Sequence, residues 1–219
     1  LPDTPEVRLD MARFNTMAKQ YDDGVGMILD CLKATGEDKN TLVIITTDHG
    51  IAFPNMKCNL TDHGIGVLLM MRGPNGVSGG KVIDSMASHV DVFPTICDYL
   101  GIAPPERLQG LSQMPVIKEE KESVRDAIFA EVNIHAGYEP MRCVRTDRYK
   151  YIKRFIEHKE PVMSNCDDGL SKDVWAEAGW AGHKLPREEL YDLTFDPMER
   201  NNIADQPEMA EVIEEMRSR

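Results

Sequence analysis

The sequence TLVIITTDHG, residues 41–50, decides how this chain folds. Leu42 to Ile45 is a short apolar run rich in β-branched residues, and this pattern predicts a buried strand of a parallel sheet. Polar residues follow at once, and they include Asp48 and His49. Open α/β sheets bind ligands at the carboxyl ends of their strands, and carboxylate oxygen and imidazole nitrogen both bind metals. We therefore predict a metal site at Asp48 and His49; the alternative is a turn aspartate beside an ordinary surface histidine.

A polar loop with one cation follows the predicted strand. The loop AFPNMK, residues 52–57, leads into NLTDHGIG, and Val67 to Met71 then forms a second apolar run. A lysine at position 57, between two strands and close in sequence to an Asp-His pair, favours a site for an anion beside a metal. The alternative is a free surface lysine. The role of Asp62 and His63, on the same loop, stays open.

Composition narrows the partners that this chain can have. It has 219 residues, a net charge of −12 and a pI near 4.9, which argues against a general surface for nucleic acid or other polyanions. An anionic substrate would have to be met by local cations. The apolar runs are too short to cross a membrane, so no membrane partner is expected. Five scattered cysteines without a CxxC pattern fit a reducing compartment or incidental thiols.

The capping residues and the spacing of apolar residues before and after this loop predict helices that pack on an α/β core. Thr4-Pro5 begins an amphipathic helix, although Gly24 and Gly26 are expected to interrupt it. Lys81 to Met86 is compatible with a short strand. A helix is predicted over Val92 to Leu100, with the preceding Ser-His-Val-Asp residues as caps in preference to metal ligands.

A charged run at residues 118–122 predicts the domain boundary, giving domains 1–120 and 121–219. The second part is expected to be a small α+β unit with an antiparallel sheet, because short strands at 127–132, 141–146, 149–155 and 189–193 precede a terminal helix. Trp175 and Trp180 lie in a long loop; they could pack on a sugar ring or fill a small core.

An ordered set of motifs resembles the sulfatases, a branch of the alkaline-phosphatase superfamily, and most closely the sulfamidases that act on N-sulfoglucosamine. The motifs are LPDTPE, DDGVGMIL, TLVIITTDHGIAFP, KCNLTDHGIGVLLMMRGP, SHVDVFPTICDYLGI, YEPMRCVRTDRYKYI and ELYDLTFDPMERNNIA. The resemblance implies the C-terminal part of an alkaline-phosphatase-like α/β sandwich plus a small α+β subdomain. It also implies hydrolysis of sulfuric esters or sulfamates on sulfated glycosaminoglycan sugars. The alternatives are a phosphoesterase or phosphonate hydrolase of the same superfamily and a non-catalytic sugar-binding module.

The resemblance also implies roles for individual residues. Asp48 and His49 match the pair that binds a divalent metal, usually calcium; manganese or zinc stays open because an imidazole is a less usual calcium ligand. Lys57 matches the basic residue that touches the sulfate and assists catalysis. His135 resembles a catalytic, substrate-facing residue at a strand end. Arg142 is expected to bind the sugar's carboxylate or sulfate, with a structural ion pair as the alternative for it and for Arg145.

The nucleophile of the family is missing from these residues. Sulfatases use a formylglycine made from Cys or Ser in a C/S-x-P-x-R motif, and no cysteine or serine here opens that motif. We therefore expect a fragment without activity of its own, whose formylglycine lies in a missing N-terminal part. Such a fragment is expected to self-associate through exposed sheet surface. Periplasmic, secreted or lysosomal placement would fit the family, and the compartment stays unknown.

Overall fold

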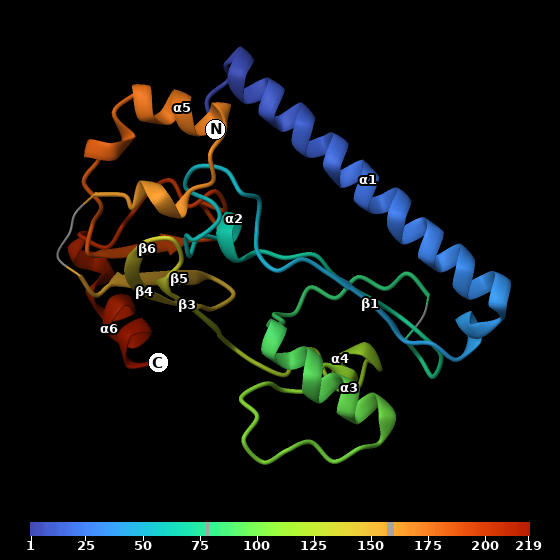
Figure 1. Ribbon diagram of the computed structural model, residues 1–219. Coiled ribbons are helices and arrows are strands. Elements are labelled where there is room, and N and C mark those ends of the chain that lie inside the picture. The colour runs from blue at the N-terminus through green and yellow to red at the C-terminus, as the bar shows by residue number, and fades with distance from the viewer. Residues whose placement is uncertain (78, 157–159) are drawn as a thin grey trace.

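The computed structural model describes residues 1–77, 79–156 and 160–219. Figure 1 shows a long helix, α1, along one side, a β1–β2 region with α3 and α4, and a separate sheet flanked by α5 and α6. The helices are α1 (Pro5–Thr35), α2 (Asp62–Ile65), α3 (Val92–Leu100), α4 (Met114–Ile117), α5 (Leu170–Glu177) and α6 (Ala210–Ser218). The strands are β1 (Val43–Thr46), β2 (Leu69–Arg72), β3 (Ile128–Ile134), β4 (Tyr138–Arg145), β5 (Tyr149–Arg154) and β6 (Glu188–Asp192). Short 3₁₀ turns lie at Glu37–Lys39, His89–Asp91, Met163–Asn165, Trp180–Gly182 and Pro207–Met209.

Helix α1 begins where the sequence predicts. The Thr4 hydroxyl accepts a hydrogen bond from the backbone N–H of Val7 (3.3 Å), and Gly36 ends the helix with a positive φ of 78°. The expected interruption at Gly24 and Gly26 is wrong: the helix runs through both, because a glycine weakens a helix without having to break it. One end of α1 contacts α5, but most of its apolar side chains stay open to solvent.

Strand β1 forms as predicted, but its surroundings differ from the prediction. It pairs antiparallel with β2, with Val43 opposite Arg72 and Thr46 opposite Leu69. Within the described residues this pairing makes a two-stranded sheet, so the predicted parallel sheet is not observed. The strand is half-buried, not buried. The physical reason is that an apolar run specifies extended backbone but does not specify the direction of the strand beside it.

Helix α3 matches its predicted range, and its start is built as a capping box. Asp91 accepts from the backbone N–H of Ser88 (2.9 Å), while the Ser88 side chain accepts from the backbone of Asp91. Asp91 is fully buried and also accepts from the backbone N–H of Leu111 (2.8 Å). Its predicted structural role is confirmed. The predicted strand over residues 81–86 is wrong, because no strand lies beside this segment in the described chain.

The four-stranded sheet has the order β3-β4-β5-β6, and all its neighbours are antiparallel, which confirms the predicted sheet. One face packs against α6 through a core of Ala127, Val144, Tyr151, Leu190, Ile213 and Met216. The other face carries Met141, Cys143, Ile152 and Tyr191, and Leu60 packs there. Leu60 belongs to the loop that carries Lys57. The sheet therefore holds the candidate functional loop against its second face.

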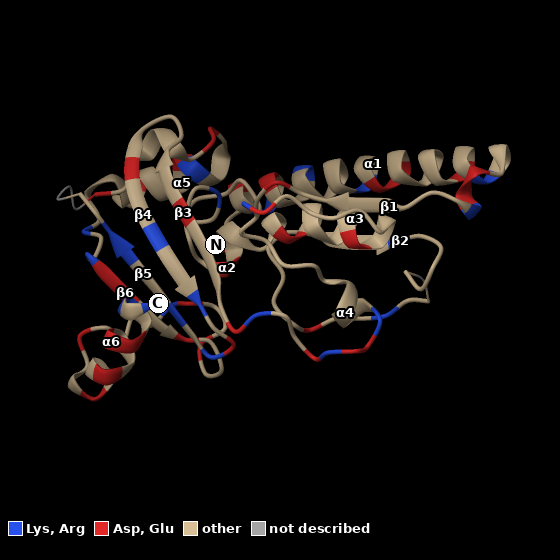
Figure 2. Cartoon of the chain, turned by 90° about the horizontal axis from the view of Figure 1, so that it is seen from below, with Lys and Arg blue, Asp and Glu red and all other residues tan. Residues whose placement is uncertain are grey.

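The connection from α4 to β3 carries both acidic and basic residues (Figure 2). It links the two regions that the sequence assigns to different domains; the boundary itself stays a prediction. All five cysteines are free. In the parts of the chain that the structure describes, no helix is both long and apolar enough to cross a membrane.

Candidate functional site

The Asp48-His49 pair lies just beyond the last residue of β1, as predicted. Asp48 Oδ1 accepts from the backbone N–H of His49 (3.0 Å), and Asp48 Oδ2 lies 3.5 Å from His49 Nε2. His49 Nδ1 lies 2.6 Å from the carbonyl oxygen of Gly50. Because Nδ1 is engaged with the backbone, Nε2 is the ring nitrogen left to face a ligand. The Asp48 carboxylate is 86% exposed, so the pair opens toward solvent.

The loop that follows is fixed by backbone hydrogen bonds. Gly50 N–H donates to the carbonyl of Gly64 (2.8 Å), and Lys57 N–H donates to the carbonyl of Ile51 (3.1 Å). Gly50 has no room for a side chain, because a Cβ there would lie 1.9 Å from the carbonyl oxygen of His63. These contacts fold the loop back so that Lys57 returns to the neighbourhood of Asp48.

Lys57 is largely buried and paired with a carboxylate. Its Nζ donates to Asp167 Oδ1 (2.8 Å) and Oδ2 (3.0 Å), and the Lys57 side chain is 15% exposed. The hydrogen bond to Asp167 raises the pKa of Lys57, and the charge of Asp48 raises it further. Sequence reasoning missed Asp167, which lies 110 residues further along the chain and belongs to no motif.

The donor set at Asp48 and His49 fits part of a divalent-metal site. Two ligand atoms bound about 2.0–2.5 Å from one ion lie roughly 3–4 Å apart, which matches the 3.5 Å between Asp48 Oδ2 and His49 Nε2. Among the described residues no group of three or more His, Cys, Asp or Glu side chains is arranged to hold a metal. The pair therefore supplies two ligands, and further ligands would have to come from other groups.

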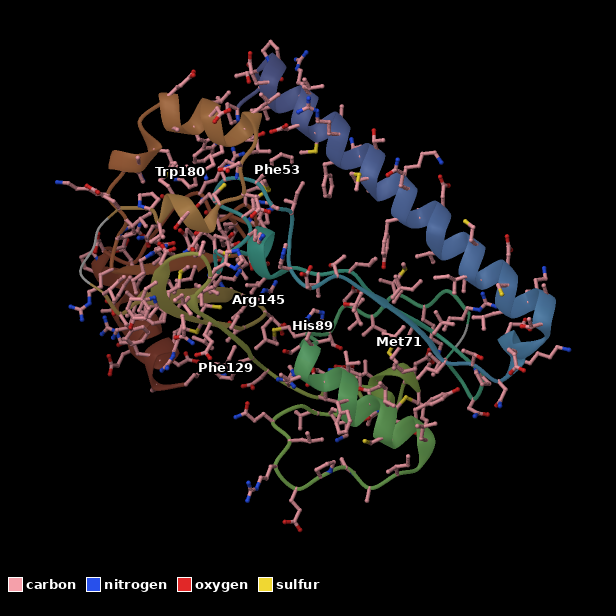
Figure 3. The ribbon with its side chains drawn as sticks, viewed as in Figure 1. Phe53, Met71, His89, Phe129, Arg145 and Trp180 are labelled. Atoms are coloured by element: carbon pink, nitrogen blue, oxygen red, sulfur yellow. The ribbon has the colours of Figure 1, made fainter. Side chains whose placement is uncertain are left out.

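A cluster of buried and partly buried charges holds α2, the helix at the end of the loop. Asp62 accepts from Arg145 (3.1 Å), which points from β4 toward α2 in Figure 3, and it pairs with Lys150. Lys150 is fully buried and also pairs with Glu199 (2.9 Å). Burial would raise the pKa of Asp62, but Arg145 and Lys150 lower it overall, whereas burial raises the pKa of Glu199. Arg145 thus forms an ion pair within the protein, and Asp62 has a structural role that the sequence left open.

His135 and Arg142 lie on the exposed side of the β3–β4 hairpin. His135 sits in the turn, where its backbone N–H donates to Gly137 (3.2 Å); in the described chain its ring has no hydrogen bond or ion pair. Gly137 N–H donates in turn to Asn165 (2.7 Å), two residues before Asp167, which places this turn beside the segment that pairs with Lys57. Arg142 pairs with Glu131 (3.3 Å) and lies over the ring of Phe155 (5.3 Å). Its role toward a sugar stays a prediction.

Comparison with known proteins places these residues in a family. The family model described as Sulfatase matches residues 3–102, and that described as N-sulphoglucosamine sulphohydrolase, C-terminal, matches residues 56–168. The chain is 30% identical to the human N-sulphoglucosamine sulphohydrolase, covering 99% of this chain and 48% of that protein. It is 28% identical to an ulvan-active sulfatase of Formosa agariphila, covering 99% of this chain and 38% of that protein.

A solved structure described as a 2-O GAG sulfatase has the same architecture. It superposes with a TM-score of 0.73 at 27% identity, over 94% of this chain and 41% of that one. This confirms the predicted α/β fold, with an antiparallel C-terminal sheet, of the alkaline-phosphatase-like kind. The chain spans less than half the length of each relative named here.

Proposed function

Because the chain belongs to the sulfatase family, we propose that the protein hydrolyses sulfuric esters or sulfamates on sulfated glycosaminoglycan sugars, N-sulfoglucosamine among them. The observation that carries the proposal is one loop: Asp48 and His49 follow β1, and the same loop folds back at Lys57, whose backbone N–H donates to Ile51. The family model that spans residues 56–168 and the relative at 30% identity both point to N-sulfoglucosamine.

In this proposal Asp48 and His49 hold a divalent metal, with calcium expected first and manganese or zinc as alternatives. Such an ion would polarise the sulfate oxygens when bound. Lys57 supplies a single positive charge for a sulfate oxygen and for the negative charge that develops as the bond to sulfur breaks. To do this Lys57 must share its charge between the substrate and Asp167. His135, on its exposed turn, is proposed as a catalytic group that faces the substrate, and Arg142 as a ligand of the sugar's carboxylate or sulfate.

The nucleophile is proposed to be a formylglycine outside these 219 residues, because the printed sequence has no C/S-x-P-x-R motif. We predict that the 219-residue chain alone releases no sulfate from N-sulfoglucosamine or from a sulfated chromogenic ester. Sulfate release by the purified chain would contradict this assignment of the nucleophile.

The direct test expresses the chain together with whatever coding sequence precedes Leu1. This protein should release sulfate from N-sulfoglucosamine, and Lys57→Ala or Asp48→Ala should each lower kcat/KM about 10²–10³-fold. Lys57→Ala removes a cation that stabilises the transition state, whereas Asp48→Ala removes a proposed ligand of the metal. Lys19→Ala is the matched control, because Lys19 pairs with Asp23 on the exposed surface of α1, and its loss should leave the rate unchanged. Hydrolysis of an aryl phosphonate but of no sulfated sugar would favour a phosphonate hydrolase instead. Unchanged rates in both variants would contradict the proposed site.

A further inference from the structure

The first turns of α1 lie against the two segments whose ion pair holds Lys57. One is the loop that carries Lys57, and the other leads from Asp167, 110 residues further along the chain, into α5. Figure 1 shows α5 beside the N-terminal end of α1, and the two helices are in contact. Asp10, Phe53 and Asp167, one from each segment, line the same cavity of about 260 Å³. The three segments therefore meet at one place.

Asp10 on α1 caps the start of α5. Its Oδ2 atom accepts a hydrogen bond from the backbone N–H of Ser171 (2.7 Å), in the first turn of α5. The residue before α5 is Gly169, which has no side chain to cap the helix, so the carboxylate from α1 satisfies one of its free backbone donors. The Asp10 side chain is 12% exposed, and its other oxygen lies 3.5 Å from the exposed Arg13. The cap of α5 thus comes from a distant part of the chain.

The first turn of α5 is tied to the residues around Asp167. Lys172, also in that turn, donates from Nζ to the carbonyl oxygen of Cys166 (2.9 Å), the residue before Asp167. The Lys172 side chain is largely buried, so this hydrogen bond is shielded from water. A displacement of α5 would therefore also displace Asp167, whose carboxylate accepts from Lys57 Nζ (2.8 Å).

The same face of α1 contacts the Lys57 loop. Phe14 lies four residues after Asp10, so the two side chains project from one face of the helix. The Phe14 ring meets the ring of Phe53 edge to face, with 6.1 Å between centroids and 65° between planes. Phe53 is buried, lies on the loop four residues before Lys57, and is beside α1 in Figure 3. One face of α1 therefore holds both segments that the ion pair joins.

We propose that Asp10 is a positioning residue for Lys57. By holding the first turn of α5, Asp10 keeps Asp167 against the Lys57 ammonium group and so sets where that group meets a substrate anion. Asp10 acts only through Asp167. The proposal rests on the proposed function for the reaction that Lys57 serves, but the contacts that lead from Asp10 to Lys57 do not depend on that reaction.

The direct readout is the pKa of the Lys57 amine, measured by NMR with labelled lysine in the 219-residue chain without added metal. Asp167 is the first cause of the raised pKa of Lys57, and Asp10 is not among the main causes. Asp10→Ala should therefore lower this pKa only by loosening Asp167. Asp10→Asn keeps an oxygen that can accept from Ser171 and should keep the pKa. Asp30→Ala is the matched control, because it removes the same charge from an exposed position of α1.

Thiol alkylation separates a local effect from unfolding. Cys166 is a buried free thiol next to Asp167, so its rate of modification by iodoacetamide, followed by mass spectrometry, reports opening of this segment. Asp10→Ala should raise that rate about fivefold, the factor that corresponds to loss of a typical helix cap. Cys143, buried in the C-terminal sheet, should react at an unchanged rate. An equal rise at Cys143 would show general unfolding and overturn the local role of Asp10.

The outcomes also separate this proposal from the proposed function. In the longer protein, Asp10→Ala should lower kcat/KM at least about fivefold, because Lys57 is no longer held in place, whereas Asp10→Asn should retain it. The proposal is overturned if Asp10→Ala leaves the pKa of Lys57 or the rate of sulfate release unchanged, or if Asp10→Asn lowers both as much as Asp10→Ala. A lowered pKa of Lys57, in a longer protein that releases no sulfate, would support the positioning role and contradict the proposed function.

Discussion

At the scale of single residues, the candidate site depends on how Lys57 is held. The Lys57 amine pairs with a carboxylate 110 residues away in sequence, so two distant segments must fold together before this cation is positioned. The ion pair with Asp167 fixes the position of the Lys57 ammonium group. A sulfate oxygen can still bind there, because it can accept a hydrogen bond from a remaining N–H of that group.

We predict that Asp167→Asn lowers the pKa of Lys57 relative to the unmodified chain, because Asp167 is the main cause that raises it. An NMR titration of the Lys57 side chain measures this directly. Asp168→Asn is the matched control, since Asp168 pairs with Lys172 and should leave the pKa of Lys57 unchanged. An equal pKa in Asp167→Asn and the unmodified chain would show that the ion pair has no influence on the amine.

The sequence could indicate Asp48, His49 and Lys57 because all three lie on one segment between two apolar runs. It could not indicate Asp167, because its importance arises from a contact across the fold. A lysine or arginine has no sequence signature that distinguishes a buried, paired side chain from an exposed one.

At the scale of elements, the ion pairs of a buried lysine connect α2 to the C-terminal sheet. Lys150 on β5 is fully buried between Asp62 at the start of α2 and Glu199 after β6. The backbone N–H of Asp62 also donates to Glu199. Since α2 ends the loop that carries the candidate site, this cluster fixes the site relative to the sheet.

We predict that Lys150→Met lowers the free energy of unfolding by about 3–5 kcal/mol, because it leaves the fully buried Glu199 side chain without its cation, while Asp62 keeps Arg145. Lys153→Met should cost less than about 1 kcal/mol, since Lys153 is partly exposed and lies 3.5 Å from Glu188. Urea unfolding of both variants checks the difference. Equal midpoints would contradict a stabilising role for the buried cluster.

A second element contact makes stability depend on pH. Burial alone would raise the pKa of Glu188 on β6, but hydrogen bonds from Arg217 on α6 and from Tyr151 outweigh it and lower the pKa from 4.5 to about 2. A carboxyl whose folded pKa is depressed stabilises the fold above its unfolded pKa. This contribution is lost as the pH falls from 4.5 toward 2.

We therefore expect Glu188→Gln to reduce the steepness with which stability falls between pH 4.5 and pH 2. Glu214→Gln is the control, because Glu214 also pairs with Arg217 but is 76% exposed. Thermal unfolding followed at several pH values measures the slopes. Parallel slopes for Glu188→Gln and the unmodified chain would contradict the depressed pKa.

The elements themselves were largely predictable. Helix α3 and the β4–β5 hairpin follow local signals, a cap with a left-handed glycine and a tight turn, that act within a few residues. The direction of pairing of β1 was not predictable, because it depends on which strand lies beside it. The sequence also did not predict that α1 continues through its two glycines, because the low helix propensity of glycine is only a weak indicator of where a helix breaks.

At the scale of the whole molecule, α1 presents a long apolar face that the described chain does not cover. Its Phe14, Met17, Tyr21 and Ile28 side chains are 42%, 63%, 50% and 62% exposed. Figure 1 shows this helix along the outer side of the molecule, joined to α5 at one end. Apolar surface of this kind favours association, whereas the net charge of −12 opposes it.

We predict that the 219-residue chain self-associates in a concentration-dependent way and more strongly as salt screens its charge. Sedimentation velocity over a range of concentrations measures this. Met17→Glu should reduce association, and Gln20→Glu, which adds the same single negative charge at an exposed polar position of α1, serves as the charge-matched control. A monodisperse monomer at all concentrations and salt levels would contradict the prediction.

The proposed function requires that Asp48, His49 and Lys57 together receive a divalent cation and a sulfuryl group. The most direct measurement is a crystal structure grown with Mn²⁺ and N-sulfoglucosamine, with anomalous data collected at the manganese edge. We predict an anomalous peak between Asp48 Oδ2 and His49 Nε2, with a sulfate oxygen near Lys57 Nζ. A peak at any other place, or an ordered sugar whose sulfate lies away from all three residues, would contradict the claim.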